Sequence, residues 1–231
     1  MIIWQKEDLS PVTNLDVAIQ EAIIDVILTY YSDDGIICEE GNMTNRTGIS
    51  NYNWIIDPID GTNNFIQGKI EYGISVGLMQ GDRFVEAYLI FPAINERYYA
   101  AIGLGIWING VVFRSQASYT GVGHKNVILC SKTFEKYRSI FESLGYMVNC
   151  YNCATYSLLM LLKREAFMYH TINTMIYDVG PMAFILKEAG VDVFNSTGSC
   201  IVFSHEMKTI PFFLALSDAD LKETFICLLE K

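Results

Sequence analysis

A run of short apolar segments between residues 54 and 113 places the strongest constraint on the fold of this chain. The segments are rich in β-branched and aromatic residues and are separated by polar or glycine-containing turns, as in a strand-rich region. Asn109-Gly110, between two apolar runs, is typical of a tight hairpin turn. We therefore predict an antiparallel meander. Its expected strands cover residues 54–56, 74–78, 84–91, 98–102 and 106–113.

The pattern changes near residue 115 to alternating strands and helices, which is typical of a layered α/β arrangement. We expect strands at 127–130, 147–150, 167–171 and 212–216, and helices at 134–144, 156–162, 179–189 and 218–229. An amphipathic helix at 13–31 and a short strand at 36–38 precede the meander. The sequence thus predicts two lobes, residues 1–115 and 116–231, that pack as one compact structural unit.

Composition excludes several classes of function. The 231 residues are 51% hydrophobic and 18% charged, which suits a folded globular chain. No apolar stretch reaches the roughly 18 residues that a membrane-spanning helix needs, and the N-terminus does not resemble a secretory signal. We therefore expect a cytoplasmic protein without a membrane partner. The net charge of −10 argues against nucleic acid, because binding a polyanion depends on clustered Lys and Arg.

The six cysteines and three histidines are not expected to bind metal. Cys150 and Cys153 form a C-x-x-C pair, but no second pair follows at zinc-site spacing. We predict that most cysteines are buried thiols and that this pair serves packing. His124, His170 and His205 are far apart in the sequence, and we interpret them as surface or packing residues.

The polar segment that follows the predicted strand 54–56 is the best candidate for a functional site. Residues 57–62 read Asp-Pro-Ile-Asp-Gly-Thr. Pro58 fixes its own φ and can force a turn that brings both carboxylates to one side. Two close carboxylates repel unless cations hold them, and hard oxygen ligands favour Mg²⁺, Mn²⁺ or Ca²⁺. Taken alone, so short a fragment is better explained as an ordinary turn.

The longer segment 54–65 resembles the first signature of the inositol monophosphatase family, W-[IV]-[IV]-D-P-[IL]-D-G-T-x-N-F. Residues 177–190 resemble the second signature and keep Asp178, with Gly180 where the family has Ala. Other similarities follow in the family's order at residues 6–16, 38–40, 95–98 and 103–110. The resemblance covers nearly the whole chain and implies an α+β fold, an αβαβα layered sandwich.

The resemblance also implies a metal-dependent phosphomonoesterase, and it assigns a role to individual residues. The cofactor would be Mg²⁺, as two or three ions that Mn²⁺ or Ca²⁺ can replace, and lithium would inhibit. The metal ligands would be the carboxylates of Glu39, Asp57, Asp60 and Asp178 and the carbonyl of Ile59. The residues near the substrate would be Asp60, Gly61, Thr62, Asn63, Ala154 and Thr171.

The catalytic pair implied by the resemblance is Thr62 and Asp16. Thr62 would orient the attacking water, and Asp16 would accept a proton behind it. The alternative for Asp16 is a helix cap that it forms with Thr13, because the pattern Thr-x-x-Asp is typical of a helix start.

Two departures from the family pattern argue against a specific preference for inositol phosphate as the substrate. Thr171 stands where inositol-preferring relatives commonly place a Glu that binds sugar hydroxyls. Asn152-Cys153-Ala154 replaces the family's G-S/T-A element and keeps only the alanine.

The chain also begins at Met1, without the helix that usually precedes the lysine-bearing loop. We expect either a homodimer that covers the exposed apolar face or a truncated gene start.

The function predicted from these observations is Mg²⁺-dependent hydrolysis of a small phosphate monoester, inositol monophosphate or a related sugar or polyol phosphate. One alternative is a 3′(2′),5′-bisphosphate nucleotidase. The other is a non-catalytic descendant of the family that acts as a protein-binding scaffold.

Overall fold

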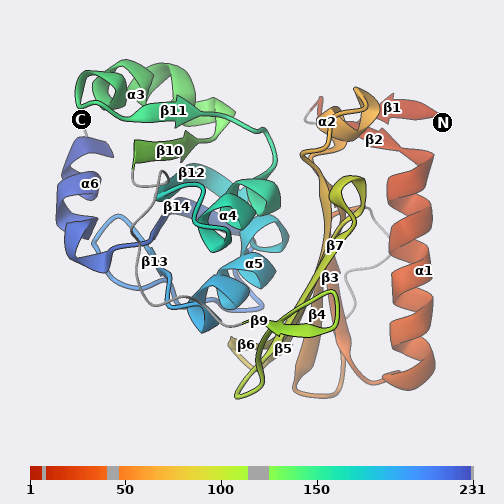
Figure 1. The fold of residues 1–231 in the computed structure, drawn as a ribbon. Coiled ribbons are helices and arrows are strands. Elements are labelled where there is room, and N and C mark those ends of the chain that lie inside the picture. Colours follow the sequence, from red (N-terminus) through yellow and green to blue (C-terminus); the bar gives the residue numbers. More distant parts are fainter. Residues whose placement is uncertain (7–8, 41–46, 114–124, 230–231) are drawn as a thin grey trace.

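The architecture is a stack of five layers in the order helix, sheet, helix, sheet, helix (Figure 1). It is described by a computed structural model over residues 1–6, 9–40, 47–113 and 125–229. The predicted α+β fold with an αβαβα sandwich is confirmed. The lobe boundary expected near residue 115 falls outside the described residues, so the division into two lobes stays a prediction.

The first sheet has seven strands in the order β3-β4-β5-β6-β7-β8-β9. All neighbours are antiparallel except β3 and β4, so the predicted meander is confirmed from β4 onward. Asn109 and Gly110, both at positive φ, form the predicted turn between β8 and β9. The strands are β3 (Gly35–Cys38), β4 (Tyr52–Asp60), β5 (Gly73–Gln80), β6 (Arg83–Phe91), β7 (Glu96–Ala101), β8 (Gly105–Ile108) and β9 (Val111–Phe113).

The second sheet has five strands in the order β11-β10-β12-β14-β13. It is mixed, because β10 runs parallel to β11 and β12 whereas β14 is antiparallel to β12 and β13. The strands are β10 (Asn126–Leu129), β11 (Met147–Asn149), β12 (Met168–Met175), β13 (Asp192–Phe194) and β14 (Thr209–Leu216). A separate two-stranded sheet pairs β1 (Ile3–Gln5) with β2 (Pro11–Thr13).

The position of each helix in the stack matches how much of its surface is apolar. Helix α1 covers the outer face of the first sheet through Ile24, Ile27 and the β4 side chain of Ile56. Helices α4 and α5 lie between the sheets and are apolar on nearly all sides, as a doubly covered helix must be. Helices α3 and α6 cover the far face of the second sheet. The helices are α1 (Asn14–Tyr30), α2 (Thr62–Ile66), α3 (Ser131–Ser143), α4 (Ala154–Leu162), α5 (Ile176–Glu188) and α6 (Lys222–Leu229).

Three strands were not predicted, and helices α3, α4 and α5 begin two or three residues earlier than expected. The strands β1, β2 and β13 have three residues each, too few for an alternating pattern to stand out. Helix α5 begins at Ile176 rather than near 179, so Asp178 lies inside its first turn. Within the described part of the chain, no helix is long and apolar enough to span a bilayer.

Gly180 allows α5 to pack closely against the first sheet. A Cβ at Gly180 would lie 2.6 Å from Cζ of Phe84, and a Cβ at Gly77 would lie 2.6 Å from Cε1 of the same ring. The Phe84 ring therefore packs closely against both glycines, because neither has a side chain. This close packing explains why the chain departs from alanine at position 180.

We expect Gly180→Ala to destabilise the protein by about 1–2 kcal/mol, because the cost of overpacking exceeds the helix propensity that alanine gains. Chemical denaturation would measure the loss. Phe84→Leu creates room for the new methyl group, so the double variant should lose less stability than the two single variants added together. A double variant whose loss of stability equals the sum of the two single losses would contradict this close packing.

Candidate metal and phosphate site

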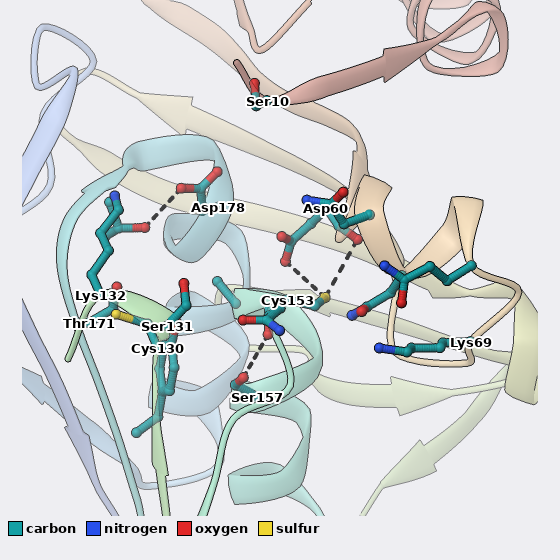
Figure 2. A pocket seen from close by; sticks show the side chains of 17 residues that line it. Ser10, Asp60, Lys69, Cys130, Ser131, Lys132, Cys153, Ser157, Thr171 and Asp178 are labelled. Carbon is teal, nitrogen blue, oxygen red and sulfur yellow. Dashed lines mark hydrogen bonds between the residues drawn. The ribbon is translucent and has the colours of Figure 1, made fainter. Parts of the chain in front are cut away.

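The candidate site is a pocket of about 600 Å³ between the two sheets. Figure 2 shows Asp60 and Asp178 on its walls, with Cys153 beside Asp60 and Thr171 farther from it. The elements that meet there are the end of β4, the first turns of α2, α3, α4 and α5, and strand β12. Glu39 and Asp57 are not among the residues that line the pocket, but the charges of Glu39, Asp60 and Asp178 all act on Asp57, so the four carboxylates lie close together.

Asp57 is the most deeply buried of the four carboxylates predicted to bind metal, with only 1% of its surface exposed. Strand β4 does not end there: it continues to Asp60 with a register shift between the two aspartates. The turn expected at Pro58 is thus a β-bulge within the strand. Oδ1 of Asp57 has no hydrogen-bond partner among the described residues. Burial, followed by the charges of Glu39, Asp60 and Asp178, raises the pKa of Asp57 well above its usual range.

Asp60 is held by the first turn of α4. Its Oδ2 accepts hydrogen bonds from the backbone N–H of Thr155 at 2.6 Å, from Oγ1 of Thr155 at 2.7 Å and from Sγ of Cys153 at 3.2 Å. Burial raises the pKa of Asp60, and the bonds from Thr155 lower it in part. Because all three donors use Oδ2, none of these bonds occupies Oδ1.

Asp178 is fixed at the start of α5. Its Oδ2 accepts a hydrogen bond from Oγ1 of Thr174 at 2.8 Å and another from the backbone N–H of Met175 at 2.9 Å. Burial, followed by the charges of Asp60 and Glu39, raises the pKa of Asp178 to about 7. The carboxylate of Asp178 therefore interacts electrostatically with Asp60 and Glu39.

Glu39 and Glu40 follow β3 and share one cation. Nζ of Lys6 lies 2.7 Å from Oε1 of Glu39 and 2.6 Å from Oε1 of Glu40. Burial lowers the pKa of Lys6, but the charges of the two glutamates and the hydrogen bonds to them raise it by more. Burial also raises the pKa of Glu40 to about 7, against the effect of Lys6. Lys6 thus offsets part of the negative charge at this wall of the site.

Thr62 and Asp16 are in contact, as predicted. Oγ1 of Thr62 lies 3.2 Å from Oδ1 of Asp16 and 2.9 Å from the carbonyl oxygen of Ile59. Asp16 is fully buried, and its Oδ2 accepts hydrogen bonds from the backbone and side chain of Thr13, which caps α1. The helix cap and the contact with Thr62 therefore coexist, each on its own carboxylate oxygen.

The remaining predicted residues lie around the same pocket. Gly61 has a φ of +86°, and a Cβ there would lie 2.8 Å from the carbonyl oxygen of Glu71, so only glycine fits. Asn63 and Ala154 line the pocket at the first turns of α2 and α4. Thr171 lines it from β12 and is 4% exposed.

The prediction that most cysteines are buried is wrong, because only Cys38 and Cys153 are buried and Cys200 and Cys227 are exposed. Cys153 also does more than pack, since its thiol contacts Asp60 and caps α4 through the backbone N–H of Tyr156. The sequence shows this cysteine next to a family motif but does not show the carboxylate that it meets.

The sequence did not predict that Thr155 and Thr174 belong to the site. It also did not predict that Lys6 pairs with Glu39 and Glu40. Thr155 and Thr174 are ordinary small polar residues in the sequence, and their partners are Asp60 and Asp178. Thr155 lies 95 residues from Asp60. No local pattern relates residues at such a separation, although the position of Thr174 four residues before Asp178 was a usable signal.

The acidic group fits a divalent cation. In the ranges that the structure describes, no three or more His, Cys, Asp or Glu side chains are arranged closely enough to hold a metal ion as they stand. The buried oxygen Oδ1 of Asp57 nevertheless lacks a partner, and the charges of Glu39, Asp60 and Asp178 all raise the pKa of Asp57. A divalent cation would relieve this repulsion, and carboxylate oxygens are the ligands that Mg²⁺ prefers.

A sequence model of the inositol monophosphatase family matches residues 4–224. This chain belongs to that family. Membership in the inositol monophosphatase family confirms the prediction that the chain is a phosphatase.

Related inositol monophosphatase family sequences carry different names. A protein of Aquifex aeolicus named fructose-1,6-bisphosphatase/inositol-1-monophosphatase is 29% identical over 81% of this chain and 73% of its own length. A protein of Pasteurella multocida named Nus factor SuhB is 28% identical over 87% of this chain and 78% of its own length. Among solved structures, the Thermotoga maritima IMPase has a TM-score of 0.85 at 23% identity, covering 100% of this chain and 87% of that one.

We expect Thr155→Val to weaken Mg²⁺ binding by about 10- to 100-fold, because the variant keeps the side-chain volume but loses the hydroxyl that orients Asp60, a predicted metal ligand. Calorimetric titration with Mg²⁺ would measure the change. Thr29→Val, which removes an exposed hydroxyl on α1, is the matched control. Equal affinity in the Thr155 variant and the control would contradict the role of this hydroxyl.

We expect the metal-free protein to lose stability as pH rises from about 4 to about 7. The folded state holds the Asp178 proton up to a pKa of about 7, against 3.8 as the ordinary value, so the folded state binds more protons in this window. Urea unfolding in a chelator, at about pH 5 and about pH 7.5, should differ by a few kcal/mol. The difference should shrink in Asp178→Asn, and an unchanged difference in that variant would refute the assignment.

Proposed function

We propose that this chain hydrolyses a small phosphate monoester with Mg²⁺ held by Glu39, Asp57, Asp60, Asp178 and the carbonyl of Ile59. The observation that carries the proposal is the buried, unpartnered Oδ1 of Asp57 within a group of acidic side chains. A group of this kind is unstable without cations and becomes an anion-binding site with them. The same pocket can therefore bind metal and phosphate together.

The cofactor, two or three Mg²⁺ ions with Mn²⁺ or Ca²⁺ as substitutes, supplies charge neutralisation for the phosphoryl group and lowers the pKa of the attacking water. The chain's own residues orient the reactants. The hydroxyl of Thr62 donates to Oδ1 of Asp16, so its oxygen can accept a hydrogen bond from the attacking water. Asp16 then receives the proton through this hydroxyl, and Thr13 holds the carboxylate in place.

The phosphate is placed against Gly61, Thr62 and Asn63. Gly61 is required by its positive φ and by the Glu71 carbonyl oxygen and the Cys153 side chain, which leave no room for a Cβ, and the next residues of the chain bring Asn63 to the pocket wall. The remainder of the substrate extends toward Ala154 and Thr171 on the opposite lobe. A small hydroxyl at Thr171 makes fewer demands on the sugar than a carboxylate would, so a sugar or polyol phosphate broader than inositol phosphate fits this wall.

The comparisons support the metal and the substrate class. A solved structure described as an IMPase/NADP phosphatase complexed with Mg²⁺ and phosphate has a TM-score of 0.84 and covers 99% of this chain, at 19% identity. The name of the Aquifex aeolicus relative refers to two small phosphorylated sugars or polyols. Lithium inhibition, a homodimer and a cytoplasmic location stay predictions.

A non-catalytic role as a protein-binding scaffold is the second candidate. It is favoured by the relatives named Nus factor SuhB. The unpartnered buried carboxylate favours the enzyme, because a scaffold has no use for repelling charges in its interior. Measuring phosphate release with and without Mg²⁺, together with Mg²⁺ binding, distinguishes the two roles.

We expect Asp57→Asn to lower Mg²⁺-dependent phosphate release by more than about 100-fold, because it removes a ligand charge without changing volume. Phosphate release from a panel of sugar, polyol and nucleoside phosphates, with and without Mg²⁺, would measure the activity. The matched control is Asp25→Asn on the exposed face of α1.

Retained activity in the Asp57 variant would refute the metal assignment. An absence of turnover on every substrate, together with no Mg²⁺ binding by calorimetry, would refute the enzyme and leave the scaffold.

A further inference from the structure

We propose that Tyr169 is a specificity-determining residue of this pocket, and that its phenol donates a hydrogen bond to a hydroxyl group on the alcohol portion of the substrate. The inference rests on the proposed function and adds a residue to which the sequence analysis gave no role. Its basis is a pair of buried hydroxyl groups, on Tyr169 and Thr171, that line the same wall of the pocket.

Tyr169 and Thr171 reach the pocket from one strand. They lie two residues apart in β12, so their side chains leave the same face of the second sheet. Both line the pocket, and they are only 3% and 4% exposed. Their register partners on the neighbouring strand β14 are Ala215 and Phe213, which belong to the apolar cluster between the sheets. The two hydroxyl groups are therefore the polar feature of an otherwise apolar part of this face.

The phenol of Tyr169 is held in place by its surroundings. Its ring packs against Phe213, with the ring centroids 6.2 Å apart. The hydroxyl of Thr171 donates a hydrogen bond to the phenol oxygen. Because Thr171 is the donor in this bond, the bond does not use the O–H of Tyr169, which can donate to a ligand. Thr171 thus orients the phenol, and the phenol extends the reach of this wall beyond a short threonine side chain.

The phenol of Tyr169 is protonated, so it acts as a donor. Burial, followed by the charges of Cys130 and Asp60, raises the pKa of Tyr169 well above its usual range, and Asp178 adds to this effect. The phenol therefore lies within electrostatic reach of two carboxylates that are predicted to bind metal. Figure 2 shows Thr171 beside Cys130 and away from Asp60, on the side of the pocket that the alcohol portion of the substrate would occupy.

A buried donor on this wall distinguishes between alcohols. When the alcohol portion fills the pocket, it displaces the water that would otherwise accept a hydrogen bond from the phenol. A hydroxyl group on the substrate replaces this water as the acceptor. A hydrocarbon of the same shape leaves the phenol without a partner, at a cost in binding free energy of about 1–3 kcal/mol. A site of this kind rejects the analogue that lacks the hydroxyl group. We therefore expect a polyol or sugar phosphate to be favoured over an alkyl phosphate.

The test compares phosphate esters that differ only in their hydroxyl groups. One pair is myo-inositol 1-phosphate against cyclohexyl phosphate, which share a six-membered carbon ring. The other pair is glycerol 2-phosphate against 2-propyl phosphate, which share a three-carbon chain. With Mg²⁺ present, the wild-type protein should favour the hydroxylated ester of at least one pair by about 10-fold or more in kcat/KM.

Tyr169→Phe keeps the ring and its packing against Phe213 but removes the donor. It should lower kcat/KM for the preferred hydroxylated ester by about 10-fold, mainly through KM, and change the matched alkyl ester by less than about 2-fold. Thr171→Val removes the hydroxyl that orients the phenol and should reduce the same preference by a smaller factor. The matched control is Tyr98→Phe, because Tyr98 is also buried but lies outside this pocket, and it should keep the preference of the wild type.

A wild-type protein without preference in either pair overturns the proposal, and so does an equal loss on both members of a pair in Tyr169→Phe, which is the result that a merely structural role predicts. If no ester is turned over, the proposed function fails separately. In that case calorimetric binding of the same pairs in Mg²⁺ tests the phenol directly. Tighter binding of the hydroxylated ester that Tyr169→Phe abolishes supports the proposal, and equal binding of both members of each pair overturns it.

Discussion

Repulsion between buried carboxylates is the interaction around which the rest of the site is arranged. The charges of Glu39, Asp60 and Asp178 all raise the pKa of Asp57, and burial raises it further. Donors from outside the group hold three of these four carboxylates, whereas Oδ1 of Asp57 has no partner among the described residues. The chain supplies these donors from different elements: Lys6 for Glu39, Thr155 for Asp60, and Thr174 for Asp178.

These donors also explain why the two sheets must stay together. Asp60 lies at the end of β4 in the first sheet, whereas its donors lie in the first turn of α4, which packs between the sheets. The shared apolar cluster includes Ile55 of the first sheet and Phe213 of the second. The packing of the central layer therefore sets the geometry of the carboxylates, and a change such as the one at Gly180 acts on the same layer.

The charged side chains that line the pocket include both carboxylates and lysines. The acidic wall suits cations and, through them, the phosphate that reacts. Lys69 and Lys132 line the same pocket outside the acidic group. Relatives of this family carry the names of several phosphatases.

The sequence by itself determined what depends on local order. Alternating apolar residues and the Asn109-Gly110 pair specify the meander, and the Asp-Pro-Ile-Asp-Gly-Thr segment specifies a strand end rich in carboxylates. Only the tertiary structure decided that Thr155 and the thiol of Cys153 hold Asp60, that Asp16 both caps α1 and meets Thr62, and that Pro58 lies in a bulge. The physical reason is range: periodicity and turn preference act over a few residues, whereas these contacts join residues up to 95 positions apart and exist only once the layers pack.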